Sequence, residues 1–121
     1  SRDGISLNAA VTLPPFLLIS DSDLCVLLSN ALENALHACQ DLPAVETAPV
    51  ISVEGYEQDS RIFLQVANPC AEPVRFENGV PISSRPGHGL GVQSICAIVK
   101  RYGGICSFSA NNGIFLLRLS L

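Results

Sequence analysis

Methionine and tryptophan are absent from this 121-residue sequence, and positively charged residues are few. Seven Lys and Arg stand against eleven Asp and Glu, which gives a formal net charge of −4. A surface for nucleic acid or anionic lipid needs a basic stripe, so we expect neither a nucleic-acid partner nor direct membrane contact. No apolar run approaches the roughly 18 residues of a membrane span. Because a natural chain starts with Met, we expect a piece of a longer protein.

The cysteines lack the patterns of disulfide frameworks and zinc sites. Their number is odd, five, and no two stand in a Cys-x-x-Cys pair. The first residues also contain no apolar signal segment. We therefore expect a reducing, cytoplasmic environment with no disulfide and no zinc, in which the thiols pack as small hydrophobic groups. The five cysteines are Cys25, Cys39, Cys70, Cys96 and Cys106.

The sequence does contain enough apolar residues to bury a core. They make up 48% of the chain, a share that excludes disorder. The length fits one unit, so we expect residues 1–121 to form a single domain. The mean hydropathy of +0.37 is high for a free-standing domain and indicates packing against a partner or a neighbouring domain.

Apolar periodicity predicts strands arranged in hairpins together with two helices. Strands that come in pairs, rather than alternating singly with helices, favour an α+β fold with a mostly antiparallel sheet and the helices on one face. The predicted elements are strands over 5–11 and 16–19, a helix over 21–40, strands over 50–53 and 61–66, a long loop over 69–87, a helix over 90–102, and strands over 105–110 and 114–119.

Two asparagines stand four residues apart in the first predicted helix. At about 100° per residue, Asn30 and Asn34 lie roughly 40° from each other, on the shoulder of the apolar stripe. Asparagine is a poor helix former, so its presence at mid-helix calls for a reason. An amide oxygen is a hard, neutral ligand suited to Mg²⁺. From spacing alone, capping of a neighbouring loop or plain solvation is a better explanation of the pair than a metal site.

A glycine-rich turn precedes the second predicted helix. Its sequence is Gly87-His88-Gly89-Leu90-Gly91, and glycines at this spacing let a backbone approach a phosphate closely. The helix that follows supplies unpaired N–H groups and a positive dipole end. The spacing is neither that of a dinucleotide fingerprint nor that of a Walker loop. Taken alone, the turn is equally typical of a flexible hinge.

The order and separation of these two motifs resemble those of one family. Asn30-Ala31-Leu32-Glu33-Asn34-Ala35 is similar to the N box, and Gly87-His88-Gly89-Leu90-Gly91 to the G2 box, of the GHKL ATPase superfamily. The resemblance covers nearly the whole chain. It is nearest to the catalytic ATP-binding domains of sensor histidine kinases, particularly those of the peptide quorum-sensing subgroup. It implies a two-layer α/β sandwich of the Bergerat type, with a mixed, mostly antiparallel sheet.

The resemblance also implies roles for single residues. Asn34 would coordinate the Mg²⁺ that bridges the ATP phosphates, and Asn30 would support the metal, its water or the phosphates. Residues 69–87 would form a lid over the ATP. Phosphate contacts are implied for the glycine-rich turn and the end of the lid, at Ser83, Ser84, Arg85, Gly87, His88, Gly89, Leu90 and Gly91.

One box of the superfamily departs from the usual pattern. Most members carry Asp-x-Gly-x-Gly, whose Asp accepts a hydrogen bond from the adenine amino group. Here the strand ends in Asn68-Pro69-Cys70 without a glycine, as in the quorum-sensing subgroup. The amide oxygen of Asn68 can still accept from an amine. The missing glycines also fit weaker nucleotide binding.

The residue types favour phosphoryl transfer over hydrolysis. Superfamily members that hydrolyse ATP carry a Glu where this chain has Asn30, and a neutral amide cannot act as a general base. Glu33 is the alternative carboxylate. Neither His37 nor His88 lies in an acceptor-type helical hairpin, so we expect the phosphoacceptor histidine on a separate helical dimerisation domain of the same protein, with a response regulator downstream. The alternatives are a degenerate nucleotide-binding or interaction module, and a GHKL-type ATPase or serine kinase.

Overall fold

The structure is a computed structural model that describes all residues except 1–3, 15–16, 44–47, 72–73 and 83–89. Neither of its helices is long and apolar enough to cross a membrane, as far as the described residues extend. The elements in chain order are β1 (Ser6–Val11), α1 (Asp21–Gln40), β2 (Val50–Gln58), β3 (Arg61–Pro69), β4 (Phe76–Glu77), β5 (Val80–Pro81), α2 (Leu90–Arg101), β6 (Ile105–Asn111) and β7 (Ile114–Ser120).

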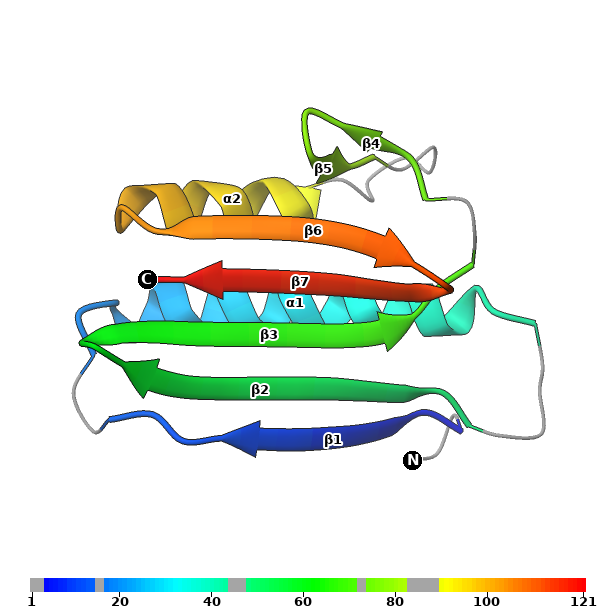
Figure 1. Cartoon of the computed structure of the whole chain (residues 1–121), viewed down its shortest axis with the longest axis horizontal. Coiled ribbons are helices and arrows are strands. Elements are labelled where there is room, and N and C mark those ends of the chain that lie inside the picture. Colours follow the sequence, from blue (N-terminus) through cyan, green and yellow to red (C-terminus); the bar gives the residue numbers. More distant parts are fainter. Residues whose placement is uncertain (1–3, 15–16, 44–47, 72–73, 83–89) are drawn as a thin grey trace.

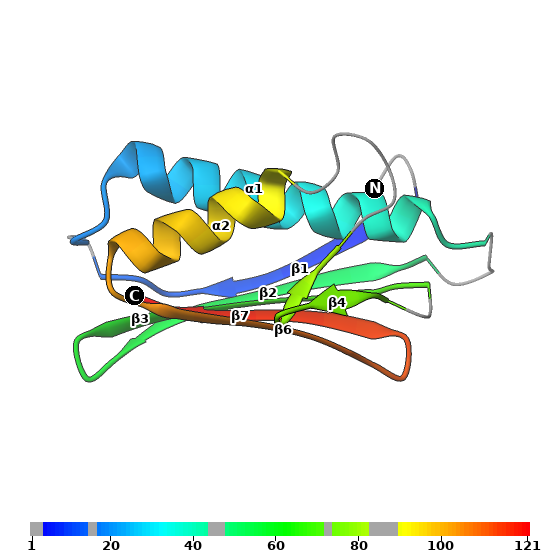
Figure 2. The same cartoon turned by 90° about the horizontal axis from the view of Figure 1, so that it is seen from above.

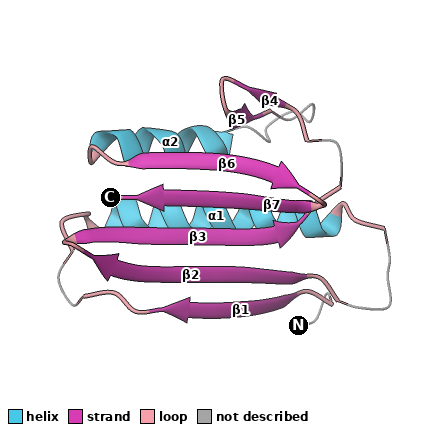
Figure 3. Cartoon of the chain, viewed as in Figure 1, coloured by secondary structure: helices cyan, strands magenta, loops and turns pink. Residues whose placement is uncertain are grey.

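Five strands form the main sheet in the order β1-β2-β3-β7-β6 (Figure 1). The β1–β2 pair is parallel, and the other three pairs are antiparallel. Both helices lie on one face of this sheet, so the molecule has two layers (Figure 2). Figure 3 shows the same separation by type of secondary structure. The predicted α+β fold with a mixed, mostly antiparallel sheet is confirmed.

The core fills the space between the helices and the sheet. In β3 and β7, burial alternates along the strand because successive side chains point to opposite faces. In α1, the buried residues recur every four positions, as expected for one face of a helix. The central core residues are Leu27, Ala31, Ala35, Ile62, Leu64, Val66, Ile95, Val99, Phe115, Leu117 and Leu119.

The start of α1 is bonded to the end of α2. The Ser20 hydroxyl caps α1 by accepting from the Asp23 amide, at 3.1 Å. The Asp23 carboxylate accepts from the Tyr102 hydroxyl at 2.5 Å and from the Arg101 guanidinium at 3.0 Å. The Tyr102 hydroxyl, followed by Arg101 and the cap, holds the pKa of Asp23 below its ordinary value of 3.8, despite some desolvation. These bonds fix the two helices against each other at one end.

Two local predictions were wrong. No strand is present in the described part of the predicted strand 16–19, because Ser20 starts the helix at once and only Ile19 of this stretch is buried; Leu18 is 99% exposed. Conversely, the predicted irregular loop contains a short hairpin, β4–β5. Asn78 and Gly79 form its turn with φ of 54° and 77°, the positive values that favour Asn-Gly.

Candidate functional site

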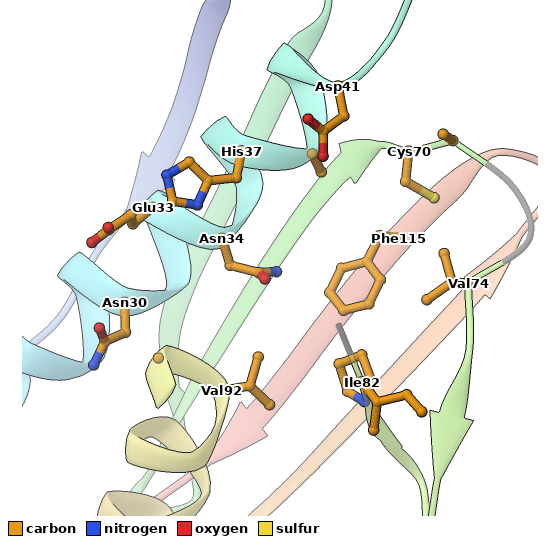
Figure 4. A pocket seen from close by; sticks show the side chains of 14 residues that line it. Asn30, Glu33, Asn34, His37, Asp41, Cys70, Val74, Ile82, Val92 and Phe115 are labelled. Atoms are coloured by element: carbon orange, nitrogen blue, oxygen red, sulfur yellow. The ribbon is translucent and has the colours of Figure 1, made fainter. Parts of the chain in front are cut away.

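A pocket of about 400 Å³ opens at one end of the helical layer (Figure 4). It lies between α1, the first turn of α2, the β3–β7 end of the sheet and the small β4–β5 hairpin. Its volume falls in the range of small-molecule sites, about 300–1,000 Å³. The lining residues are Asn30, Glu33, Asn34, His37, Ala38, Asp41, Cys70, Ala71, Val74, Pro81, Ile82, Gly91, Val92 and Phe115.

The polar wall of the pocket comes from one side of α1. Asn30, Asn34, His37 and Asp41 follow each other at three- or four-residue spacing, which places them along the same side of a helix. The side-chain amide of Asn34 points into the cavity, towards Phe115 (Figure 4). Both asparagines that the sequence singles out thus line the pocket, and Glu33 lies in the helical turn between them.

Glu33 borders the pocket but is directed away from it. Its side chain is exposed, and its carboxylate points to the opposite side of α1 from the amide of Asn34 (Figure 4). Neighbouring residues on a helix differ by about 100° in direction. Asn34 and Glu33 are therefore adjacent in α1, yet the Asn34 amide points into the pocket and the Glu33 carboxylate points away from it.

Asn30 lies against the first turn of α2. A Cβ atom built on Gly91 would stand 3.4 Å from Asn30 Oδ1 and 3.7 Å from Asn30 Cβ. The asparagine side chain thus packs directly on the glycine backbone, where α1 and α2 meet. Gly91 brings the last residue of the glycine-rich turn into the wall of the pocket.

The opposite wall of the pocket is apolar. Phe115 is buried at the start of β7, Val92 projects from α2, and Val74 and Ile82 flank the β4–β5 hairpin (Figure 4). Phe115 and Val92 were not predicted as part of the site, and Val74 and Ile82 were predicted only as members of the lid formed by residues 69–87. The register between β3 and β7 is the feature that would have identified Phe115, because Phe115 pairs directly with Asn68.

Asn68 lies beside the pocket rather than in its wall. It is 2% exposed on the helix-facing side of β3, and its Nδ2 donates to the Pro69 carbonyl at 2.9 Å. Its two neighbours, Phe115 across the sheet and Cys70 along the chain, do line the pocket. Asn68, the residue predicted to bind adenine, is thus a direct neighbour of pocket residues without lining the pocket itself.

Two of the residues predicted to contact phosphate belong to α2. Leu90 is the first residue of this helix, and Gly91 follows in the pocket wall. The other predicted phosphate contacts lie outside the described residues; they are Ser83, Ser84, Arg85, Gly87, His88 and Gly89.

A comparison with protein families identifies the class to which the chain belongs. A family model described as "GHKL domain" matches residues 19–121, which is most of the chain. The chain therefore belongs to the GHKL family of ATP-binding domains. A comparison with curated proteins found no match.

Solved structures show the same fold in the catalytic domains of histidine kinases. A mycobacterial sensor histidine kinase, MprB, is 21% identical with a TM-score of 0.71, over 99% of this chain and 83% of that one. The nucleotide-free catalytic domain of the histidine kinase ThkA is 15% identical with a TM-score of 0.74, over 99% and 80% of the two chains. Full-length ShkA in complex with AMPPNP is 19% identical with a TM-score of 0.71, and the match covers 98% of this chain and 26% of ShkA.

Proposed function

We propose that this chain is the Mg-ATP-binding catalytic domain of a two-component sensor histidine kinase. The observation that carries the proposal is the pair of amides, Asn30 and Asn34, which both line the pocket on α1, with Asn30 packed against the first turn of α2. Residues 1–121 act as one domain in this account, and residues 69–87 act as the lid over ATP. The domain works in the cytoplasm.

Asn34 is the residue that would hold the metal. Its amide points into the cavity, and Mg²⁺ binds hard oxygen ligands, keeping waters and phosphate oxygens as its other partners. Asp41 lines the same pocket. Its negative charge disfavours a bare polyphosphate and favours one that arrives with a cation. Asn30 would support the metal, its water or the phosphates from the α2 side.

The glycine-rich turn would bind the phosphates. Gly91 lies in the first turn of α2, where backbone N–H groups and the helix dipole favour an anion. We assign the phosphate contacts to Gly87, Gly89 and Gly91, with Ser83, Ser84, Arg85, His88 and Leu90 beside them. Glycines allow the close backbone approach that such contacts need.

The apolar wall would hold the adenine ring. Phe115, Val92 and Ile82 offer flat and branched apolar surfaces opposite the polar side of α1. We assign the contact to the adenine amino group to the amide oxygen of Asn68, the residue that pairs with Phe115 across β3 and β7. An asparagine here, in place of the usual aspartate, supports a place in the peptide quorum-sensing subgroup.

The chemistry is transfer of the γ-phosphate to a histidine on a separate helical dimerisation domain of the same protein, which then passes it to a response regulator. Phosphoryl transfer depends on positioning and charge neutralisation. Asn30 is neutral and cannot deprotonate water. A nucleophile supplied by a partner domain therefore fits this pocket better than a water molecule does.

Labelled phosphate transfer tests this function. The chain is incubated with Mg²⁺ and γ-labelled ATP, with and without the helical dimerisation domain. We expect label on the added domain in an acid-labile, base-stable form, as for phosphohistidine, and none on this chain. Stable label on the chain itself, label on a serine, or release of inorganic phosphate alone would contradict the proposal.

The position of Glu33 keeps ATP hydrolysis as a second candidate, because its side chain borders the pocket. If Glu33 activates water, Glu33→Gln should lower the rate of ATP consumption by roughly 100-fold or more. If it does not, as its outward direction in Figure 4 indicates, the variant should consume ATP at the unchanged rate.

A further inference from the structure

Two cysteine side chains meet between α2 and β6. The Cys106 thiol donates to the sulfur of Cys96, and the two Sγ atoms are 3.8 Å apart. A disulfide bond is about 2.05 Å long, so the sulfurs need to approach by less than about 2 Å. Rotation of the side chains about χ1 can supply part of such a movement without moving the backbone.

A tight connection holds the two sulfurs near each other. Between them, the chain leaves α2 and turns into β6 through Gly103, whose φ is 69°, and Gly104. The Gly103 amide donates to the Lys100 carbonyl at 3.0 Å, and the Gly104 amide donates to the Val99 carbonyl at 2.9 Å. These two backbone hydrogen bonds hold the end of α2 close to the start of β6, and the two thiols therefore lie near each other in the folded protein.

The pair lies outside the nucleotide pocket and within reach of solvent. Cys96 and Cys106 are both half-buried. Cys106 belongs to β6, one of the two edge strands of the sheet. Gly91 in α2 and Tyr102, which directly follows the helix, contact α1 and lie on the other flank of the helix from Cys96. A small oxidant can therefore reach the sulfurs from the edge of the sheet.

We propose that Cys96 and Cys106 form a site of reversible covalent oxidation, at which a peroxide converts the two thiols into an intramolecular disulfide. In the first step a Cys96 sulfur–oxygen bond forms, the peroxide O–O bond breaks, and water leaves, which gives a sulfenic acid. In the second step Cys106 attacks the Cys96 sulfur, the S–S bond forms, the S–O bond breaks, and a second water leaves. Two thiols are oxidised and one peroxide is reduced.

The order of the two steps follows from the surroundings of Cys106. Burial, and then the neighbouring Cys96, raise the pKa of the Cys106 thiol to about 11. The thiolate is the nucleophile in both steps. Cys106 is therefore mostly protonated at neutral pH, which disfavours it as the first nucleophile. The first attack is assigned to Cys96 and the closing step to Cys106, whose proton then leaves with the hydroxyl group of the sulfenic acid as water.

Tryptic mapping tests the proposal directly, because Lys100 and Arg101 lie between the two cysteines. After digestion, Cys96 is the sole cysteine of peptide 76–100, and Cys106 is the sole cysteine of peptide 102–118. The folded protein is treated with hydrogen peroxide, its remaining thiols are alkylated, and the digest is analysed by mass without reductant. We expect the two peptides to be joined, and dithiothreitol to separate them.

Single variants complete the test. Cys96→Ser and Cys106→Ser should each abolish the joined pair, whereas Cys25→Ser, which removes an exposed thiol, should leave its yield unchanged. The two serine variants are first shown to unfold cooperatively, so that loss of the pair is not loss of the fold. A folded wild-type protein that gives only alkylated peptides, or only disulfides between molecules through Cys25, would overturn the proposal.

Discussion

At the scale of single residues, direction along one helix decides which chemistry the pocket supports. Asn34 and Glu33 are neighbours in sequence, yet the amide enters the cavity and the carboxylate leaves it (Figure 4). The side chain that we propose to hold the metal is therefore neutral, while the carboxylate of Glu33 is exposed to solvent. This arrangement supports transfer to another nucleophile rather than to water.

One glycine is required by the space around it. A Cβ atom on Gly104 would stand 2.0 Å from the Ser120 carbonyl oxygen, which is backbone and cannot rotate away. We expect Gly104→Ala to lower the free energy of unfolding by about 2 kcal/mol or more, since the β6–β7 end must shift. Urea denaturation measures the loss. Ser107→Ala, on the exposed side of β6, is the control and should change little. Equal stability of the two variants would contradict this packing.

At the scale of elements, the relation of α1 to α2 shapes the site. The helices are joined at one end by Asp23, Arg101 and Tyr102, and they touch nearer the pocket at Asn30 and Gly91. The hydrogen bonds of Asp23 hold one end of the two helices together and so restrict how the helices pack at Asn30 and Gly91. The position of the amide pair relative to the first turn of α2 therefore depends on bonds that lie outside the pocket.

The Asp23 bonds should make stability depend on pH. Because the pKa of Asp23 is lowered in the folded state, its contribution is present above the ordinary value of 3.8 and is lost as pH falls through the folded-state pKa. We expect the melting temperature of Asp23→Asn to lie below that of the wild type at pH 7. This difference in melting temperature should become smaller below about pH 4. Glu57→Gln, at an exposed position of β2, is the control. A difference that widens on acidification would contradict the account.

The buried stripe of α1 should carry much of the stability of the helical layer. Leu27 is 0% exposed in the core, whereas its neighbour Val26 is 45% exposed. We expect Leu27→Ala to lower the free energy of unfolding by about 3–5 kcal/mol, from lost burial and the cavity left behind. Val26→Ala, the matched control, should cost under about 0.5 kcal/mol. Denaturant titration of both variants compares them, and a similar cost would show that the face of α1 is misassigned.

At the scale of the whole molecule, local patterns predicted most of the elements. The serine that caps α1, the four-residue stripe of α1 and the Asn-Asn-Gly turn before β7 are local signals of this kind, since each acts over a few residues, and each is present in the structure. The wrong strand at 16–19 has a local cause as well. An apolar run after a pair of prolines is typical of a strand. Here Ser20 caps α1 directly after this run.

The apolar half of the site required the tertiary structure. Asn30 and Asn34 are visible from spacing because they are polar residues at unusual positions. Phe115, Val92 and Ile82 are ordinary core-type residues in sequence, and only the sheet order and the α2 contact bring them to one cavity. The position of Asn68, paired with Phe115 on the neighbouring strand, also follows from strand register rather than from any motif.

The most direct test of the central claim is a calorimetric titration of Mg-ATP into the wild-type domain and its Asn34→Ala variant. Asn34→Asp, which keeps an oxygen ligand, and Asn8→Ala, at an exposed position of β1, are the controls. We expect binding to weaken by roughly 10-fold or more in Asn34→Ala and when Mg²⁺ is withheld, and to be retained in both controls. Equal affinity with and without Mg²⁺ and Asn34, or no heat from folded wild-type protein at millimolar nucleotide, would contradict the account.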